Sequence, residues 1–293
     1  MSGVAQDAIN ALNVGSLYAL YALGIAMIFG ILRLINFAHY SLIMAGAYAM
    51  VQTAGLPLVV RILVTVAVCV VMAVLLELVA FRAVRGASPA TMLVTSFAVS
   101  FALASLAETI FGSLPKSTTV HPWTRQSWSF GGVYVPRLNV ITIVVTALLL
   151  VALSQFLTRT TIGLQMRAAA EDFSTSRLLG VRANRVISVA FAISGVLAAA
   201  ASILLLGTTG SVTPTFGLNA VLFGLVAAVV GGLNSLKGAA VGGFALGIIG
   251  QLLQRYLPLE LRPYADALLF AAVFLLLVLR PQGIISRGAG VRV

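Results

Sequence analysis

From Thr158 to Arg185 the sequence reads T-R-T-T-I-G-L-Q-M-R-A-A-A-E-D-F-S-T-S-R-L-L-G-V-R-A-N-R. This stretch holds five arginines and two adjacent acids, whereas the chain as a whole is 60% hydrophobic and only 9% charged. Ionised side chains are costly inside hydrocarbon unless they are paired. We therefore expect residues 158–185 to face water, as a loop between segments that lie in a membrane.

The composition of the whole chain is typical of a polytopic membrane protein. Its 293 residues have a mean hydropathy of +1.09, which lies outside the range of soluble globular domains. No polar stretch is long enough for a separate soluble domain, so we expect an all-α fold with one transmembrane domain over residues 1–293. The formal charge of +11 fits an excess of Lys and Arg in cytoplasmic loops and calls for no nucleic acid partner.

Nine apolar segments can be drawn along the chain. Several are shorter than the roughly twenty residues that a perpendicular membrane helix needs. We therefore expect about eight or nine transmembrane or broken helices, with eight true spans as the nearest alternative to nine. The segments cover residues 9–30, 38–53, 58–81, 89–112, 139–157, 186–207, 217–233, 238–256 and 263–280.

Basic residues set the expected orientation, because cytoplasmic loops are enriched in Lys and Arg. An N-terminus outside and a C-terminus in the cytoplasm place about twice as many basic residues inside as outside. The first ten residues lack a basic region and contain Asp7, so we expect no cleaved signal peptide. The expected cytoplasmic set is Arg33, Arg82, Arg85, Arg159, Arg167, Arg177, Arg182, Arg185, Lys237, Arg280, Arg287 and Arg292.

Residues 113–138 form the longest connection expected on the other side, a periplasmic loop. They contain three prolines, Trp123, Trp128 and the pair Gly131-Gly132, a pattern that predicts a loop or a small hairpin. Tryptophans at this position in a membrane protein commonly anchor the chain at the interface, and contact with a partner is the alternative.

Small residues recur at four-residue steps in the last third of the chain. Examples are Gly238 with Gly242 and Gly243 with Gly247. This spacing lets helix backbones approach one another closely, so we expect tight helix packing there.

Two stretches share a layout in which glycine precedes a polar break. The first runs from Phe29-Gly30 to Asn36, and the second from Gly231-Gly232 to Asn234. Helices broken at membrane depth are tolerated beside protein or a water-filled path, so the breaks point to a translocation route. Helix-end capping is the alternative reading of the same residues. The candidate route residues are Asn36, His39, Ser41, Asn234 and Ser235.

The sequence also limits the chemistry that we expect. It contains no G-x-x-x-x-G-K-[ST] phosphate loop, so any ATP must be hydrolysed by another chain. The single cysteine and two distant histidines, His39 and His121, suggest no metal site. Glu77 lies close to Arg82 and Arg85 in sequence, and we expect it to form a structural ion pair with them.

Residues 161–180 favour a helix inside the charged loop. Thr160 or Thr161 can cap its start and Gly180 can end it. Three consecutive alanines have short side chains, so another protein can pack closely against the helix beside the charged groups. The residues that we expect at such a docking surface are Arg167, Ala169, Ala170, Glu171, Asp172 and Gly180.

This A-A-A-E-D segment, with a glycine nine residues after the glutamate, resembles the coupling loop of ABC importer permeases. Further matches make the chain similar to the branched-chain amino acid permease family, and specifically to its shorter, LivH-type subunit. They are G-L-Q-M-R-A-A-A-E-D-x-x-x-x-R-L-L-G-V-R-A-N-R-V-I, L-I-N-F-A-H, E-L-V-A-F-R-A-V-R-G, V-V-G-G-L-N-S-L-K-G-A-A-V-G-G and the closing L-R-P-Q-G.

The resemblance implies a permease subunit without an ATPase site of its own, in the bacterial inner membrane. It implies as partners a LivM-type second permease, two ATP-binding subunits that carry ATP and Mg²⁺, and a periplasmic substrate-binding protein. Tyr40, Ser41 and Ala98 depart from the family pattern, which leaves urea, amides and aromatic or short-chain acids open as cargo besides branched-chain amino acids. A self-sufficient secondary carrier or channel is the alternative from another class.

Overall fold

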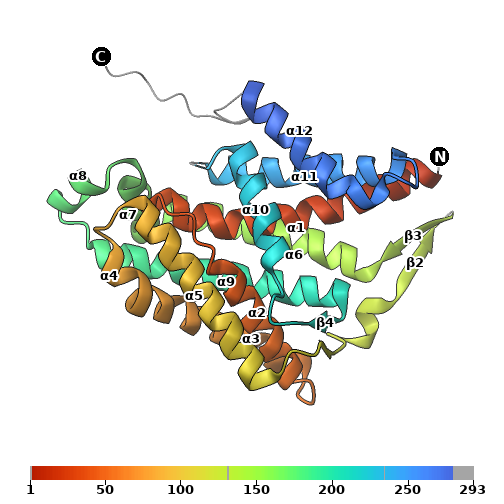
Figure 1. Cartoon of the computed structure of the whole chain (residues 1–293), viewed down its shortest axis with the longest axis horizontal. Helices are drawn as coiled ribbons and strands as arrows, with labels where there is room; N and C mark the ends of the chain where they lie inside the picture. The colour runs from red at the N-terminus through yellow and green to blue at the C-terminus, as the bar shows by residue number, and fades with distance from the viewer. Residues whose placement is uncertain (1, 131, 234, 280–293) are drawn as a thin grey trace.

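The computed structural model describes residues 2–130, 132–233 and 235–279 of the chain (Figure 1). Helices make up most of the described chain, and its strands pair in two small two-stranded sheets. The helices are α1 (Ser2–Leu32), α2 (His39–Gln52), α3 (Leu58–Leu76), η1 (Glu77–Phe81), α4 (Arg82–Val84), α5 (Pro89–Phe111), η2 (Pro122–Arg125), α6 (Arg137–Arg159), α7 (Thr161–Glu171), α8 (Phe173–Leu178), α9 (Ala183–Thr209), α10 (Leu218–Gly231), α11 (Leu236–Tyr256), η3 (Arg262–Tyr264) and α12 (Ala265–Leu279). The strands are β1 (Lys116–Ser117), β2 (Ser127–Phe130), β3 (Val133–Pro136) and β4 (Ser211–Val212).

Seven of the described helices are long and apolar enough to cross a membrane. Two further helices, α2 and α10, have 14 residues each and are about 21 Å long, too short for a hydrocarbon core of about 30 Å. These nine elements match the nine apolar segments one for one. The prediction of an all-α polytopic fold with some broken helices is therefore confirmed.

The α1 helix lies at the centre of the molecule and packs on α6, α9, α10 and α11. Its contact with α11 is the most extensive because small residues bring the two backbones together. A Cβ atom at Gly243 would collide with the backbone of Ala19, and one at Gly247 with the backbone of Gly15. The tight packing predicted from the glycine spacing is thus observed.

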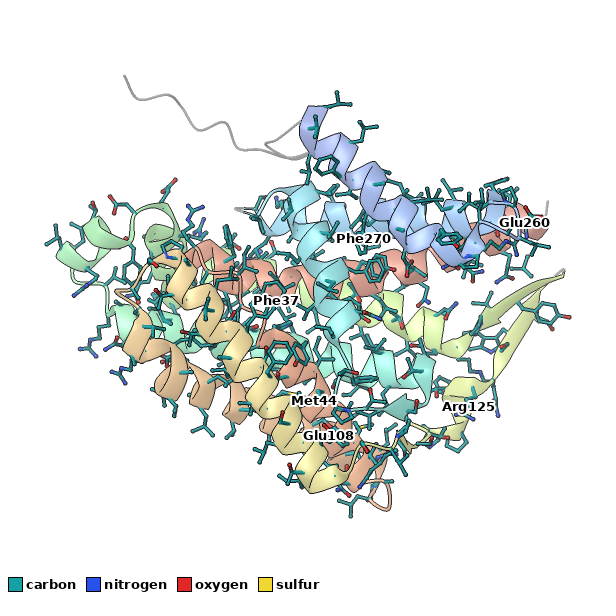
Figure 2. The ribbon with its side chains drawn as sticks, in the orientation of Figure 1. Phe37, Met44, Glu108, Arg125, Glu260 and Phe270 are labelled. Carbon is teal, nitrogen blue, oxygen red and sulfur yellow. The ribbon has the colours of Figure 1, made fainter. Side chains whose placement is uncertain are left out.

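The molecule has two distinct ends (Figure 1). The N-terminus of α1 and the hairpin of β2 and β3 lie at one, the hairpin end; α7 and α8 lie at the other, the loop end. Figure 2 shows Arg125 and Glu260 on the side of the hairpin end. The hairpin predicted within residues 113–138 is confirmed, with Trp128 facing Val135 and Ser129 facing Tyr134 across its antiparallel strands.

Two arginines hold the hairpin end together. Arg61 is 5% exposed and donates hydrogen bonds from its guanidinium to the carbonyl oxygens of Val120, at 2.8 Å, and Met50, at 3.1 Å. Arg137 lies over the rings of Trp123 and Trp128, 4.8 and 5.2 Å from their centroids. Each arginine therefore joins the loop of residues 113–138 to the helices below it.

Candidate functional site

The charged loop folds as two capped helices, α7 and α8. The Thr160 hydroxyl accepts a hydrogen bond from the Gly163 amide at 3.0 Å and so begins α7. The Asp172 carboxylate accepts one from the Thr175 amide at 3.0 Å and so begins α8. Gly180 follows with a φ of +87°, a conformation that favours glycine. The expectation of one helix over residues 161–180 was wrong, because an aspartate that caps a new helix interrupts the old one.

Three contacts seat α7 firmly on the membrane helices. Gly163 lies so close to α6 that a Cβ atom would collide with the backbone of Phe156 and Leu157. Met166 and Ala169 are buried. From the end of α1, the Arg33 guanidinium donates a hydrogen bond of 3.1 Å to the carbonyl oxygen of Ala170, one of the carbonyls that a helix leaves open at its C-terminus. The α7 helix is therefore fixed to α1 and α6 at once.

The outer surface of the loop is both charged and apolar. Arg167, Glu171 and Asp172 are exposed, whereas Ala170 is half-buried. Two leucines of the α8 turn are largely open to water: Leu178 is 89% exposed and Leu179 is 80% exposed. Adjacent leucines so open to water on a hydrogen-bonded turn are typical of a surface that a partner protein covers.

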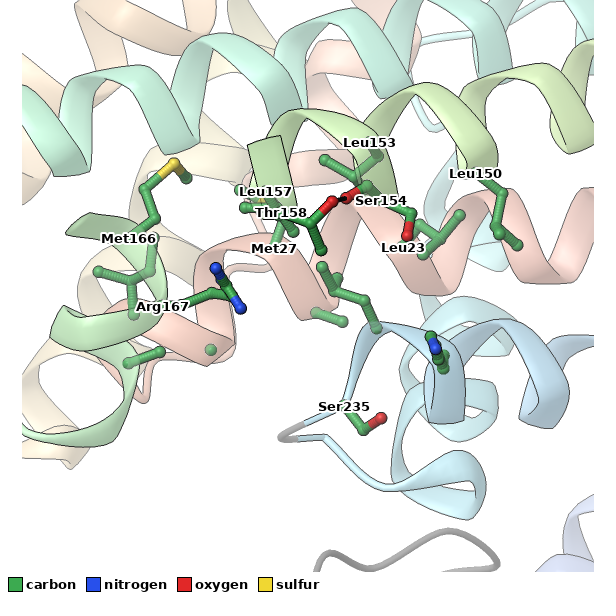
Figure 3. Close-up of a pocket in the computed structure, with 16 residues that line it drawn as sticks. Leu23, Met27, Leu150, Leu153, Ser154, Leu157, Thr158, Met166, Arg167 and Ser235 are labelled. Atoms are coloured by element: carbon green, nitrogen blue, oxygen red, sulfur yellow. Dashed lines mark hydrogen bonds between the residues drawn. The ribbon is translucent and has the colours of Figure 1, made fainter. Parts of the chain in front are cut away.

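A cavity of about 280 Å³ lies between α1, α6, α7 and the start of α11 (Figure 3). Its walls are mostly apolar, and its polar lining includes Arg167, Lys237 and Ser235. Of the candidate route residues in the described chain, Ser235 alone lines this cavity.

The first helix break, residues 33–38, is closed by buried polar contacts. The Asn36 side chain is 1% exposed, and its oxygen accepts a hydrogen bond from the Ala38 amide at 3.0 Å. The Ser96 hydroxyl on α5 accepts one from the Phe37 amide at 3.4 Å. The backbone of the break is thus satisfied by side chains, one of them from another helix.

His39 and Ser41 continue this buried region at the start of α2. The His39 ring fits where Gly24 of α1 has no side chain, since a Cβ atom there would collide with it. His39 Nδ1 lies 3.1 Å from the Ser194 hydroxyl of α9. The Ser41 and Tyr40 hydroxyls both approach the carbonyl oxygen of Ser100, at 3.5 and 3.1 Å. These residues therefore lock α2 to α1, α5 and α9, and are closed off from solvent in this structure.

The second helix break lies between α10 and α11. The Ser235 hydroxyl accepts a hydrogen bond from the Gly238 amide at 3.1 Å and caps α11. Gly231 and Gly238 meet so closely that a Cβ atom on either would collide with the backbone of the other. Asn234, the remaining candidate route residue, lies outside the described residues.

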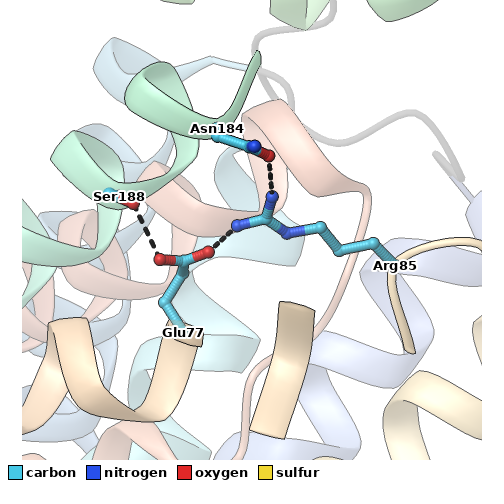
Figure 4. A network of polar contacts seen from close by, with 4 residues as sticks. All are labelled: Glu77, Arg85, Asn184 and Ser188. Atoms are coloured by element: carbon cyan, nitrogen blue, oxygen red, sulfur yellow. Dashed lines mark hydrogen bonds and ion pairs between the residues drawn. The ribbon is translucent and has the colours of Figure 1, made fainter. Parts of the chain in front are cut away.

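A polar network joins the turn η1 and the residue after α4 to the helix α9 near the loop end (Figure 4). Glu77 is fully buried at the start of the π-helical turn η1, where it forms an ion pair with Arg85 and accepts a 2.7 Å hydrogen bond from Ser188. Arg85 also donates a 2.6 Å hydrogen bond to the Asn184 side chain. Partial burial lowers the pKa of the Arg85 guanidinium, which nevertheless stays charged. Arg82, the other expected partner of Glu77, is exposed.

Several residues of these sites were not predicted. Arg33 has a left-handed backbone conformation, with a φ of 52°, and no pattern in the sequence predicts it. Ser188 and Ser194 lie in an apolar helix where serine is unremarkable, so only their partners reveal them. The exposed pair Leu178-Leu179 had a detectable signal, because two leucines within a charged loop are unusual. Within the described residues, no group of three or more His, Cys, Asp or Glu side chains is placed to hold a metal ion.

Comparison with known proteins finds a family that covers nearly the whole chain. Residues 8–278 match the sequence model of the family described as "Branched-chain amino acid transport system / permease component". The chain is 32% identical to the high-affinity branched-chain amino acid transport system permease protein BraD of Pseudomonas aeruginosa, over 96% of this chain and 95% of that protein. It is 30% identical to the corresponding protein LivH of Escherichia coli K12, again over 96% and 95%.

A more distant similarity extends to a second kind of permease protein. This chain is 31% identical to the permease protein LivM of Salmonella typhimurium. The similarity covers 60% of this chain and 42% of LivM. The relatives are permease components of transport systems.

Proposed function

This chain belongs to the branched-chain amino acid transport permease family, and from that premise we propose that it is the membrane-spanning subunit of an ATP-driven importer. Its cargo is a branched-chain or related hydrophobic amino acid. ATP and Mg²⁺ are bound by separate ATPase subunits, and this chain supplies half of the path through the membrane.

The exposed pair Leu178-Leu179 carries the proposal of a docked ATPase. Burying one exposed leucine stabilises a complex by about 1.5–3 kcal/mol, so leaving two in water is unfavourable unless a partner covers them. The neighbouring Arg177 and Arg182 surround the leucines with charge, as the polar rim of an interface does. A groove in the ATPase that receives α8 and the exposed face of α7 would bury both features.

The seating of α7 supports the mechanism. Because Gly163 packs on α6 and Arg33 joins α1 to Ala170, a push on α7 acts on two membrane helices together. Closure of two ATPases around ATP would supply that push. The bundle would then rock between outward-open and inward-open states, which is alternating access by rigid-body motion.

The distribution of basic residues supports the orientation. Arg33, Arg85 and Lys237 lie at the loop end with the arginines of residues 158–185, so the loop end faces the cytoplasm and the N-terminus the periplasm. The hairpin end is then free to receive a periplasmic binding protein, with Tyr134 64% exposed on β3. Similarity to LivM favours a LivM-type second permease as the partner within the membrane.

The docking assignment is tested by replacing Leu178 and Leu179 with aspartate in the assembled importer. We expect ATPase binding to weaken at least tenfold, as measured by co-purification and titration, and amino acid uptake into proteoliposomes to fall with it. The matched control is Leu259→Asp with Leu261→Asp, which places the same charge on two exposed leucines at the opposite end. Undiminished ATPase binding in the double variant would refute the docking assignment.

Two further measurements separate this proposal from its alternatives. Uptake into vesicles that hold the permeases without any ATPase would identify a self-sufficient carrier instead. The cargo is tested with the periplasmic binding protein that serves this permease. If that protein binds urea, an amide or an aromatic acid but not leucine, isoleucine or valine, the amino acid assignment is wrong and the importer assignment remains.

A further inference from the structure

The cavity between α1, α6, α7 and α11 is amphipathic along its length (Figure 3). Leu23 and Leu150 line it, as do Ile31 and Thr158 two turns further along the same helices. Eight residues of helix rise about 12 Å, so this is a slot with depth. Among the described residues, the cations that line it, Arg167 and Lys237, lie on α7 and in the first turn of α11, so one end is basic and the other is apolar.

The basic end of the slot holds Arg167 and Lys237, both exposed and on different helices. The Ser235 hydroxyl lines the same cavity and can donate a hydrogen bond, whereas the Thr158 hydroxyl donates to the Ser154 carbonyl oxygen at 2.8 Å. A guanidinium, an ammonium and a hydroxyl group around one opening suit an anion with several acceptor oxygens, such as a phosphate.

The apolar part of the slot lies between membrane-spanning helices. Both α6 and α11 pack extensively on α1, whereas packing between α6 and α11 is slight at most. The α1 residues Leu23 and Met27 are buried and form the floor of the cleft. A hydrocarbon chain in the slot would make close van der Waals contact with the apolar side chains of α1, α6 and α11.

We propose that this slot binds an anionic phospholipid of the leaflet at the loop end, with its headgroup between Arg167 and Lys237 and part of one acyl chain along α1. A basic pocket between membrane helices is a recognised setting for anionic headgroups. The volume of about 280 Å³ holds a headgroup and the beginning of a chain, and the remaining hydrocarbon lies in the bilayer. A free anion at the basic end would leave the apolar part of the slot unfilled. Because Arg167 belongs to α7, a bound lipid also braces the α7 helix against α11.

The test measures lipid bound to the purified, assembled complex. The complex is equilibrated with vesicles of phosphatidylcholine containing one fifth phosphatidylglycerol, and the retained lipids are counted by native mass spectrometry. We expect phosphatidylglycerol to be retained in preference to phosphatidylcholine. Lys237→Gln should lower its retention about fivefold, and Lys237→Gln with Arg167→Gln should lower it further by a similar factor, because one basic residue near an anionic surface contributes about that much. Lys237→Arg should restore it.

Two controls make the result specific. Arg159→Gln removes the same charge from the end of α6 but outside the lining of the cavity, and should leave retention unchanged. Ser154→Trp fills the apolar slot without changing charge, and should exclude the lipid. Lys237 is exposed, so its substitution does not disturb the core and tests the site even if the tryptophan variant folds poorly.

Three outcomes would overturn the proposal. Equal retention of the two lipids, or an Arg159→Gln effect as large as that of Lys237→Gln, would show only general attraction to the membrane. Displacement of phosphatidylglycerol by millimolar inorganic phosphate would assign the site to a free anion, and displacement by leucine would assign it to the transported cargo. Absence of retained phosphatidylglycerol would show that another subunit fills the slot. The ATPase-docking result is independent of all three.

Discussion

The two helix breaks, residues 33–38 and 232–235, have the same layout in sequence but are closed by different kinds of contact in the structure. In the first, polar side chains satisfy the backbone, with Asn36 bonded to the Ala38 amide and Ser96 reaching in from α5. In the second, two glycines bring the backbones of α10 and α11 into direct contact. A glycine before a polar break therefore predicts where a helix stops without predicting what closes the gap.

The largest expected difference between the breaks is in the stability change when the glycine before each break, Gly231 or Gly30, is replaced with alanine. Gly231→Ala adds a methyl group that collides with Gly238, and overpacking of this kind costs about 1–3 kcal/mol. Gly30→Ala meets no atom within 4 Å, and replacing a helical glycine with alanine contributes roughly 0.5–1 kcal/mol of stability. Thermal unfolding of both purified variants in one detergent checks the pair. Equal midpoints would break the comparison.

The next effect concerns the fit of His39 against Gly24. Gly24→Ala introduces a collision with the His39 ring, and His39→Ala removes the ring together with its contact to Ser194. We expect the double variant to be more stable than the sum of the single variants predicts, by about 0.5–3 kcal/mol. A double-mutant cycle on unfolding midpoints measures this coupling. Simple additivity would mean that the ring and the glycine do not constrain one another.

A loss of comparable size is expected from Asn36→Ala, which leaves the Ala38 amide without its buried acceptor. An unsatisfied buried donor costs about 1–3 kcal/mol. Ser96→Ala should cost less, because the bond from the Phe37 amide is longer, at 3.4 Å. Hydrogen exchange at the amides of residues 37 and 38 distinguishes the two, since each variant should expose its own amide first.

The smallest effect is expected from Ser235→Ala. It removes the helix cap from α11 at a half-buried site, where loss of a serine cap costs about 1 kcal/mol. Ser235→Asn should preserve stability, because asparagine caps a helix equally well and adds no charge. A loss of transport in Ser235→Asn despite unchanged unfolding would show that the second break has a role beyond capping.

The helical architecture could be predicted almost completely because hydrophobicity and helix length decide it. All nine apolar segments correspond to helices, including the two short ones, and the helix stop at Gly180 followed from glycine's tolerance of positive φ. The interruption at Asp172 was missed because aspartate is tolerated in a helix unless its side chain captures a nearby amide, as it does with Thr175.

The polar contacts were less predictable because they join residues far apart in sequence. Glu77 was expected to have a partner among nearby arginines, and the structure pairs it with Arg85. Ser188 comes from α9, more than a hundred positions away, and no local pattern points to it. The same holds for Arg33, whose contact with Ala170 depends on how α1 ends.

The contacts at the two ends of α1 have a thermodynamic consequence. This helix is about 46 Å long. At the hairpin end the Gln6 side chain accepts a hydrogen bond from the Tyr134 amide at 2.8 Å, and at the loop end Arg33 donates one to Ala170. A helix bonded at both ends connects the hairpin to the loop through one continuous element. Any coupling of binding free energies between the two ends is reciprocal. If a substrate-loaded binding protein at the hairpin raises the affinity of the loop for the ATPase, then ATPase binding must raise the affinity of the hairpin for the binding protein by the same factor.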